Sequence, residues 1–422
     1  PFHGGNTSSN LVRDANTQIM QLRHHASCQT GEELFCAGQP AFDSNGCLIS
    51  GQIYRFMGSG RGCWQRAFTL GRCDLQGSVP TKGRWDRSKS VFKMNKAQVI
   101  HALGAPDVMT WQDWPLPDLA AGEVRLRHTA IGVNYADTYH RGGISHPWPV
   151  SPPPVVIGFE GVGIVEGVGE GVTDFATGDR VAYGIPPLGS YSETRNYPAD
   201  KLLHLPAELD DRHVAALLMK GMTAHYLLHR TYKVKPGDVI LVHAAAGGMG
   251  LILCQWARAL GAITVGTVST PEKAELARAA GCHYPVVRSE QSFVDEVMRV
   301  SDGEGCAVVY ESIGKDTLQQ SLDSLRPMGV CAAYGHVSGP PDPVDIIQDL
   351  GRRGSLFITR PAIMHYVAKR SDLEWTAKDL FAAMGNGILD ANINYEYALK
   401  DAVTAHRAIE SGTTSGATVL IP

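Results

Sequence analysis

The chain has 422 residues, more than the roughly 100–200 of one typical domain, so two or three domains are expected. Its formal net charge is −4 and no long Lys/Arg run occurs, which gives no strong sign of a nucleic-acid-binding surface. No stretch of about 18 apolar residues and no basic segment followed by an apolar one is found, so we predict neither a membrane span nor a signal peptide. We expect a cytoplasmic protein with small or neutral partners.

Residues 1–93 differ in kind from the rest of the chain. They mix Gly, Ser, Arg, Cys and Trp without sustained helix or strand periodicity. We expect foreign or upstream translated sequence here, poorly ordered and without a function of its own; the alternative is a small appended domain. The chain holds 9 cysteines but no C-x-x-C pair, so none is assigned to a metal or a disulfide.

From Met94 the sequence patterns become regular. Residues 123–131 alternate polar and apolar, as a half-buried strand does, and residues 155–169 are strand-like but rich in glycine. Residues 174–183 contain a turn that leads into another strand. These patterns indicate a β-rich, barrel-like domain.

After Pro206 the pattern changes to alternating helices and strands. Helices are expected at 211–230, from 250, and at 271–280, 292–300 and 318–325; strands are expected at 239–242, 262–268, 285–287, 307–310 and 329–334. Strands that are apolar throughout and separated by helices predict a doubly wound parallel sheet. Beyond about residue 356 helix and strand patterns mix, and the terminal strand 417–422 fits a domain completed by both ends of the chain.

The most informative motif is a short apolar strand, Val239–Val242, that runs into glycines and continues as a helix. Gly247, Gly248 and Gly250 let the backbone approach a ligand closely, and the helix after them offers free N–H groups and a positive dipole end to an anion. A strand before the glycines and a helix after them predict a dinucleotide site.

The second strand of this unit distinguishes the two nicotinamide cofactors. An NAD site places an acidic residue near its end, but residues 265–270 contain none. Lys273 follows in the first turn of the next helix and Arg288 closes the third strand, and a ribose phosphate would suit both cations. We therefore predict NADPH; the alternative is that Lys273 and Arg288 are solvated side chains.

The chain from Met94 to Pro422 resembles the zinc-independent quinone oxidoreductase (zeta-crystallin-like) branch of the medium-chain dehydrogenase/reductase superfamily. The resemblance rests on residues 132–142, 220–228, 234–250, 310–314, 405–407 and 414–416. It implies a GroES-like catalytic domain formed by residues 94–216 and 357–422, a Rossmann NADPH-binding domain at 217–356, and a homodimer.

The resemblance also implies particular cofactor contacts. Arg288 departs from the Tyr or His common at its position, and Gly412 stands where many relatives have Arg, which leaves one contact open. The predicted cofactor-binding residues are Thr223, Ala246, Gly247, Gly248, Met249, Gly250, Gly266, Ser269, Lys273, Arg288, Gly314, Tyr334, Gly335, His336, Ile358 and Arg360.

The ligands of a catalytic zinc are missing. A zinc alcohol dehydrogenase of this superfamily would have Cys at the position of Asn134 and His at that of Phe159, so no metal is predicted. Without a Lewis acid, oxidation of an alcohol loses its usual electrostatic help. Reduction of a quinone needs less help, since one or two hydrogen bonds can stabilise the anion that forms.

Asn134 and Tyr139 are the predicted catalytic residues, as groups that orient or hydrogen-bond the acceptor. The structural alternatives are a turn residue for Asn134 and a core aromatic for Tyr139. His140, His146 and His225 could supply a proton, although delivery by solvent is simpler.

The leading functional hypothesis is an NADPH-dependent quinone oxidoreductase that transfers hydride to a quinone or related conjugated carbonyl. An enoyl or alkenal reductase is the alternative among enzymes. The alternative outside enzymes is a catalytically silent NADPH- or RNA-binding crystallin-like protein.

Overall fold

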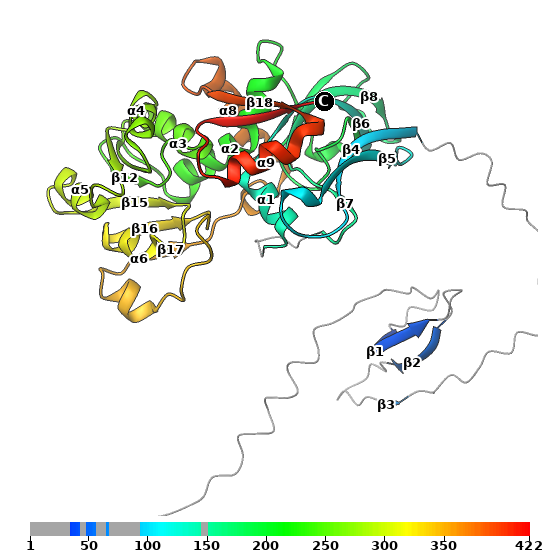
Figure 1. Ribbon diagram of the computed structural model, residues 1–422, viewed down its shortest axis with the longest axis horizontal. Coiled ribbons are helices and arrows are strands. Elements are labelled where there is room, and N and C mark those ends of the chain that lie inside the picture. Colours follow the sequence, from blue (N-terminus) through cyan, green and yellow to red (C-terminus); the bar gives the residue numbers. More distant parts are fainter. Residues whose placement is uncertain (1–33, 43–47, 56–64, 67–92, 145–150) are drawn as a thin grey trace, which may run out of the picture. The chain divides into compact units, whose positions relative to one another are not determined.

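The computed structural model describes residues 34–42, 48–55, 65–66, 93–144 and 151–422, with side chains described from Met94 onward. The chain divides into two units, Pro1–Arg87 and Ser88–Pro422. In the first, β1 (Leu34–Phe42) pairs antiparallel with β2 (Leu48–Arg55), which pairs antiparallel with β3 (Gln65–Arg66) (Figure 1). The sequence patterns indicated no strand here. In β1, register shifts on both sides of Ala41 interrupt the regular pairing with β2.

The second unit contains a six-stranded parallel sheet. Its strands are β12 (Val239–Val242), β13 (Ile263–Val268), β14 (Tyr284–Val287), β15 (Cys306–Glu311), β16 (Leu325–Ala333) and β17 (Phe357–Thr359). Their order, β14-β13-β12-β15-β16-β17, is that of a Rossmann dinucleotide-binding sheet. The predicted doubly wound parallel sheet is therefore confirmed.

Both faces of this sheet are buried, which explains the apolar runs in its strands. Ile240 and Val242 of β12 belong to one hydrophobic cluster, whereas Leu241 between them belongs to another. Four α-helices lie between the parallel strands in sequence: α3 (Gly248–Ala259), α4 (Pro271–Ala279), α5 (Phe293–Val300) and α6 (Leu318–Asp323). The other described α-helices of the second unit are α1 (Tyr135–Gly142), α2 (Asp211–Tyr226), α7 (Ile363–Tyr366), α8 (Arg370–Gly385) and α9 (Ala402–Glu410). Short 3₁₀ helices span Pro106–Val108, Ala199–Lys201 and Leu399–Asp401, and π-helical turns span Leu227–Thr231 and Ile346–Gly351.

The remaining strands form two sheets that are mostly antiparallel. They are β4 (Lys93–Ile100), β5 (Met109–Leu116), β6 (Glu123–Gly132), β7 (Val155–Val156), β8 (Gly161–Val168), β9 (Arg180–Tyr183), β10 (Thr194–Pro198), β11 (Leu203–His204), β18 (Ile393–Ala398) and β19 (Ala417–Ile421). One sheet runs β11-β9-β8-β6-β19-β18, with β10 also paired to β6, and the other runs β5-β4-β7. The C-terminal strand β19 pairs with β6, so distant parts of the second unit share one sheet.

The domain boundaries predicted at residues 93, 216 and 356 stay predictions. The helix α2 spans the second boundary, and β17, the last strand of the parallel sheet, lies just beyond the third.

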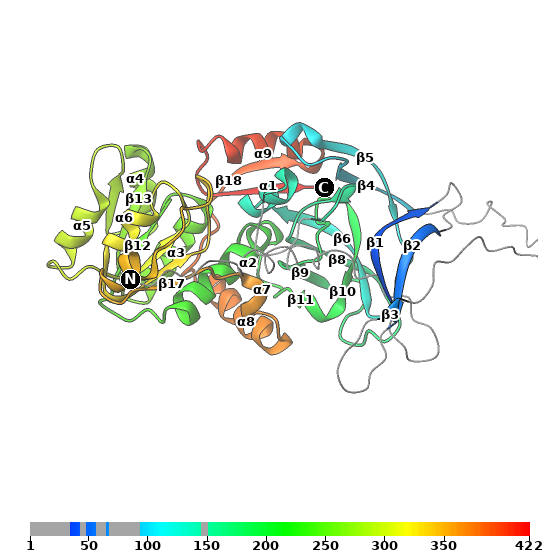
Figure 2. The same ribbon diagram turned by 90° about the horizontal axis from the view of Figure 1, so that it is seen from below.

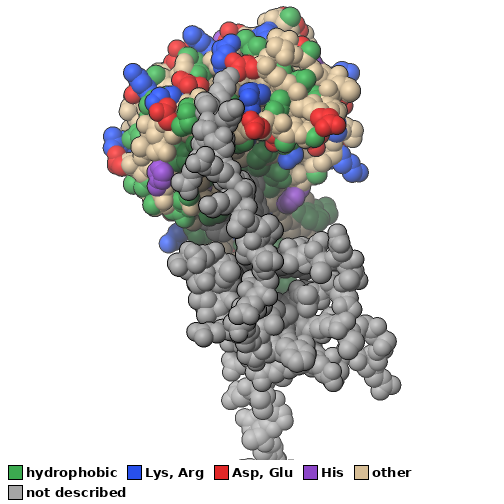
Figure 3. All heavy atoms as spheres, turned by 90° about the vertical axis from the view of Figure 1, so that its right-hand side faces the viewer, with side chains coloured by type: hydrophobic (Ala, Val, Ile, Leu, Met, Phe, Trp, Pro, Cys, Tyr) green, Lys and Arg blue, Asp and Glu red, His purple; other side chains and the backbone are tan. Residues whose placement is uncertain are grey.

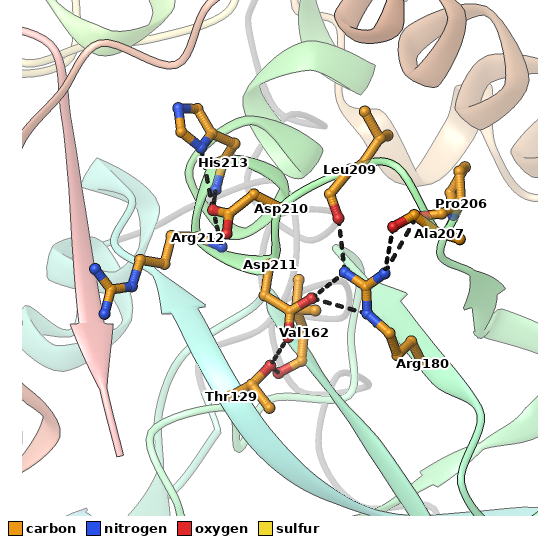
Figure 4. A network of polar contacts seen from close by, with 10 residues as sticks. All are labelled: Thr129, Val162, Arg180, Pro206, Ala207, Leu209, Asp210, Asp211, Arg212 and His213. Atoms are coloured by element: carbon orange, nitrogen blue, oxygen red, sulfur yellow. Dashed lines mark hydrogen bonds and ion pairs between the residues drawn. The ribbon is translucent and has the colours of Figure 1, made fainter.

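Helix α2 connects the two parts of the second unit, since it contacts β6, β8 and β19 of the mostly antiparallel part and also α3, which follows the parallel strand β12 (Figure 2). It packs against α8 as well. Polar contacts fix its first turn. The side chain of Asp210 accepts hydrogen bonds from the backbone N–H groups of Arg212 and His213, and Asp211 pairs with Arg180 (Figure 4). Arg180 also donates to the carbonyl oxygen of Leu209 at 2.6 Å. The start of α2 is thereby anchored to β9.

Candidate active site

A cavity of about 510 Å³ lies at the carboxyl ends of the parallel strands, where open α/β sheets bind their ligands. Residues that follow β6 and α9 line its other side. The cavity brings together the following predicted site residues: Asn134, Tyr139, Thr223, Ala246, Gly247, Gly248, Met249, Gly250, Ser269, Lys273, Arg288, Tyr334, Gly335 and Arg360.

Four other predicted residues lie outside the lining. A Cβ on Gly266 would lie 2.6 Å from Sγ of Cys282, and Gly314 has φ +95° with a Cβ position 2.6 Å from a backbone oxygen. These two glycines therefore allow the backbone around the cavity to pack closely. Ile358 packs into a core cluster of the parallel sheet, and His336 stacks on Tyr139, with ring centroids 4.6 Å apart.

The glycine loop leaves the first amides of α3 open to a ligand. Gly247 is the N-cap residue of α3 and provides no side-chain cap. A Cβ on Gly250 would lie 2.2 Å from the carbonyl oxygen of Ala244, so only glycine allows this close turn. Free N–H groups at the start of a helix suit a pyrophosphate.

The charges in the cavity also suit a phosphorylated dinucleotide. The charged side chains among the described lining residues are Lys220, Lys273, Arg288 and Arg360, and none of these lining residues is Asp or Glu. The ammonium of Lys273 donates to the carbonyl oxygen of Gly412 at 2.7 Å, which holds it beside the end of β13. The residues present thus fit NADPH by shape and by charge.

Asn134 is the N-cap residue of α1 and is 6% exposed. Its backbone N–H donates to Oδ2 of Asp137 at 2.8 Å, and its Nδ2 donates to Oε1 of Glu160 at 2.6 Å. Glu160 is fully buried and also accepts from the backbone N–H of Met219 at 2.7 Å. The Asn134 side chain is therefore more than a turn residue, because a buried carboxylate fixes its orientation at the cavity wall.

Tyr139 lies on α1 and is 6% exposed. Its ring is sandwiched between contacts with Tyr135, edge to face at 5.3 Å, and His336, stacked at 4.6 Å. Burial raises the pKa of Tyr139 to about 12, although a hydrogen bond with the His336 backbone opposes the rise. At neutral pH Tyr139 therefore keeps its proton and is a hydrogen-bond donor.

His140 and His225 are poor candidates for the proton donor, because burial lowers their pKa values and neither lines the cavity. Burial lowers the pKa of His140 to about 4, and burial also lowers the pKa of His225, whose Nε2 lies 3.0 Å from Asp379. Neither is among the described residues that line the cavity. His146 lies outside the described residues.

Lys220 and Glu160 were not predicted as site residues. Lys220 lies on α2 with its Nζ 3.3 Å from Oε1 of Glu160, and it lines the cavity. One signal could have identified it: a single lysine within the apolar stretch Val214–Met222 of this helix needs a buried partner.

A second buried pair supports the floor of the cavity. Nε2 of His243 lies 3.3 Å from Oε2 of Glu311 and 2.8 Å from Oγ of Ser321. Burial alone would raise the pKa of Glu311, but His243, Ser321 and two backbone amides lower it, so the carboxylate is ionised. This network joins β12 to β15 next to the glycine loop.

No group of three or more His, Cys, Asp or Glu side chains that could hold a metal ion is found within residues 94–144 and 151–422. Phe159, at the position of a zinc-binding histidine, is fully buried.

The chain matches two family models. Residues 120–207 match the alcohol dehydrogenase GroES-like domain, and residues 248–370 match the family described as zinc-binding dehydrogenase. The observed sheets agree with these matches, so the predicted combination of a GroES-like and a Rossmann domain is confirmed.

This chain aligns with similar proteins over almost the full length of those proteins. A 2-haloacrylate reductase from a Burkholderia species is 54% identical over 331 residues, which cover 78% of this chain and 99% of that protein. A quinone oxidoreductase from Pseudomonas aeruginosa is 43% identical over 329 residues, covering 78% of this chain and all of that protein (100%). The solved structure of an Escherichia coli quinone oxidoreductase complexed with NADPH matches with a TM-score of 0.75 and 39% identity, over 78% of this chain and 100% of that one.

The chain therefore belongs to the quinone oxidoreductase family of the medium-chain dehydrogenase/reductase superfamily, as the sequence resemblance predicted.

Proposed function

We propose that this protein is an NADPH-dependent oxidoreductase that transfers a hydride to a quinone or a related conjugated carbonyl. The observation that carries the proposal is one cavity in which the glycine loop and a wholly cationic set of charged side chains meet Asn134 and Tyr139. Relatives named quinone oxidoreductases, one of them solved with NADPH, support it.

Different residues of the cavity would bind the cofactor and orient the acceptor. The free amides of the glycine loop bind the pyrophosphate, and Lys273 and Arg288 bind the ribose phosphate. NADPH, when bound, supplies the hydride. Asn134 and Tyr139 orient the acceptor, and the Tyr139 hydroxyl donates a hydrogen bond to the oxygen on which negative charge develops.

A steady-state assay tests the proposal. The purified chain should oxidise NADPH in the presence of quinones and prefer NADPH to NADH. Lack of turnover with every quinone and every conjugated carbonyl tested would refute the proposal.

A second acceptor class has its own support. Arg360 lines the cavity and donates to the carbonyl oxygen of Ala333 at 3.0 Å, and a guanidinium is well suited to a carboxylate. The relative at 54% identity is named a 2-haloacrylate reductase. Reduction of the carbon–carbon double bond of a conjugated acid or enal is therefore the second candidate. Turnover of 2-haloacrylates or enals without turnover of quinones would favour it over the first.

A catalytically silent NADPH- or RNA-binding protein remains the alternative outside enzymes. It predicts NADPH binding, measured by fluorescence titration, without turnover of any acceptor. On the face shown in Figure 3, basic and acidic side chains of the described residues are interspersed, which gives RNA no uniformly basic surface there.

We propose a homodimer formed along β17. This strand is an edge of the parallel sheet and, among the described strands, pairs only with β16. Phe357 on it is 60% exposed, and Ile346 and Ile347 nearby in sequence are 74% and 64% exposed. In sedimentation experiments the wild type should be dimeric and Phe357→Glu monomeric; a monomeric wild type would contradict the proposal.

We also propose that residues 1–93 carry no function of their own and that the protein is cytoplasmic. None of the helices in the described part of the chain is long and apolar enough to cross a membrane. Deletion of residues 1–87, up to the start of the second unit, should leave activity and melting temperature unchanged. A large loss of either would favour the appended-domain alternative, and cell fractionation tests the location.

A further inference from the structure

Lys220 is held at the cavity wall by the same carboxylate oxygen that orients Asn134. Its Nζ lies 3.3 Å from Oε1 of Glu160, and Nδ2 of Asn134 lies 2.6 Å from that oxygen. Two nitrogen donors thus converge on one buried acceptor. The Lys220 side chain is 10% exposed and that of Glu160 is fully buried. The exposed part of Lys220 faces the cavity, since Lys220 is among its lining residues.

The backbone around Lys220 is tightly packed. Gly221, the next residue on α2, has a Cβ position only 2.4 Å from Cδ1 of Leu380, so α2 lies close against α8. On the other side, Cε of Lys220 lies 3.4 Å from the Cβ position of Gly248 in the glycine loop. The ammonium is therefore confined between the loop, Glu160 and the cavity.

Other polar side chains of the cavity are less suited to give up a proton next to Asn134. A guanidinium such as that of Arg360 does not deprotonate in proteins. The pKa of Tyr139, raised to about 12 by burial, means that its hydroxyl holds its proton tightly. Lys273 is bound to the carbonyl oxygen of Gly412 beside the end of β13. Only Lys220, among the described lysines that line the cavity, lies beside Asn134.

We propose that Lys220 is a further catalytic residue, whose ammonium stabilises the oxyanion formed on the acceptor and then protonates it. This inference rests on the proposed function. Hydride transfer from NADPH brings an electron pair to the acceptor and leaves an oxyanion on it. One N–H bond of the ammonium then breaks as the O–H bond of the product forms, and the neutral amine regains a proton from water. Glu160 holds the ammonium in place and takes no part in the transfer.

Four variants test the inference. Lys220→Gln removes the charge and the proton, whereas Lys220→Arg keeps the charge without a proton that can be transferred. The double variant Glu160→Gln, Lys220→Gln removes both buried charges. It therefore distinguishes loss of a catalytic ammonium from the effect of leaving the charge of Glu160 without a partner. Lys378→Gln, on the exposed face of α8, is the matched control. For each, kcat, the NADPH Kd from fluorescence titration, the melting temperature and the pH profile are measured.

We expect Lys220→Gln to lower kcat by about 100-fold while the NADPH Kd changes by less than about threefold. Lys220→Arg should keep part of the activity, because it retains the positive charge but has no proton that it can transfer. The double variant should stay as slow as Lys220→Gln, and the control should match the wild type.

Three results would overturn the inference. They are a wild-type kcat in Lys220→Gln or Lys220→Arg, recovery of kcat in the double variant, and a rise in the NADPH Kd that accounts for the lost activity. The last would make Lys220 a cofactor-binding residue. If the wild type itself reduced no acceptor, the proposed function would fail, and this inference with it.

Discussion

Replacing Asp137 with asparagine should remove a pH-dependent loss of stability from this protein. Asp137 is fully buried in α1, where its Oδ2 accepts from the backbone N–H of Asn134 at 2.8 Å and from the Tyr191 hydroxyl at 3.1 Å. Its Oδ1 has no hydrogen-bond partner among the described residues. Burial raises the pKa of Asp137 from 3.8 to about 7; the Asn134 hydrogen bond opposes the rise and the charge of Glu160 adds to it.

The sign of the effect is set by proton binding. Between pH 3.8 and about 7 the folded state holds a proton that the unfolded state has lost, so the free energy of unfolding falls as pH rises. The stabilisation is complete below the unfolded pKa and is lost as pH rises through the folded pKa. At about 1.4 kcal/mol per pKa unit, the change across this window is roughly 4 kcal/mol.

Asparagine keeps an oxygen that can accept both hydrogen bonds and cannot ionise. Its amide nitrogen would replace the unpartnered Oδ1 of Asp137, at a cost of about 1–3 kcal/mol. The variant should therefore gain stability relative to the wild type as pH rises from about 5 to about 8, and it should be as stable or more stable at about pH 8.

Urea unfolding of both proteins at several pH values between about 5 and 8 measures this difference. The exposed Asp342→Asn is the control and should match the wild type at every pH. A difference between wild type and Asp137→Asn that stays constant across the range would refute the assignment of the raised pKa to Asp137.

Three further predictions concern the site. Replacing Lys273 and Arg288 together by alanine should reduce the preference for NADPH over NADH by at least about 100-fold, because each lost charge-assisted bond contributes about 1.5–3 kcal/mol; an equal rise in KM for both cofactors would contradict the phosphate assignment. Gly250→Ala should weaken NADPH binding and lower the melting temperature, since its Cβ would lie 2.2 Å from a carbonyl oxygen. An unchanged Kd for NADPH would contradict the assignment of the glycine loop to cofactor binding. Tyr139→Phe should lower kcat about tenfold without changing the NADPH Kd, and an unaltered kcat would remove the hydroxyl from the mechanism.

Local patterns were sufficient to predict most elements of the parallel sheet. The strand Val239–Val242 was predicted with the observed ends, because an apolar run that leads into glycines has few other solutions. The helix α4 begins where Thr270 can cap it and Pro271 fits its first turn. Differences fall at element ends: a helix is predicted to Arg230, but the α-helix α2 ends at Tyr226 and passes into a π-helical turn.

Contacts between distant segments could not be predicted in this way. The glycine loop and the two cations near the ends of the second and third strands are set by local sequence, so the sequence by itself was sufficient to predict a phosphorylated dinucleotide site. The joining of Asn134, Glu160 and Lys220 depends on how β6, β8 and α2 pack, and nothing local to any of them specifies the others. Periodicity and capping act over a few residues, whereas the position of a buried charge depends on the fold of the whole unit. The tertiary structure alone therefore decided which side chains meet at this wall of the cavity.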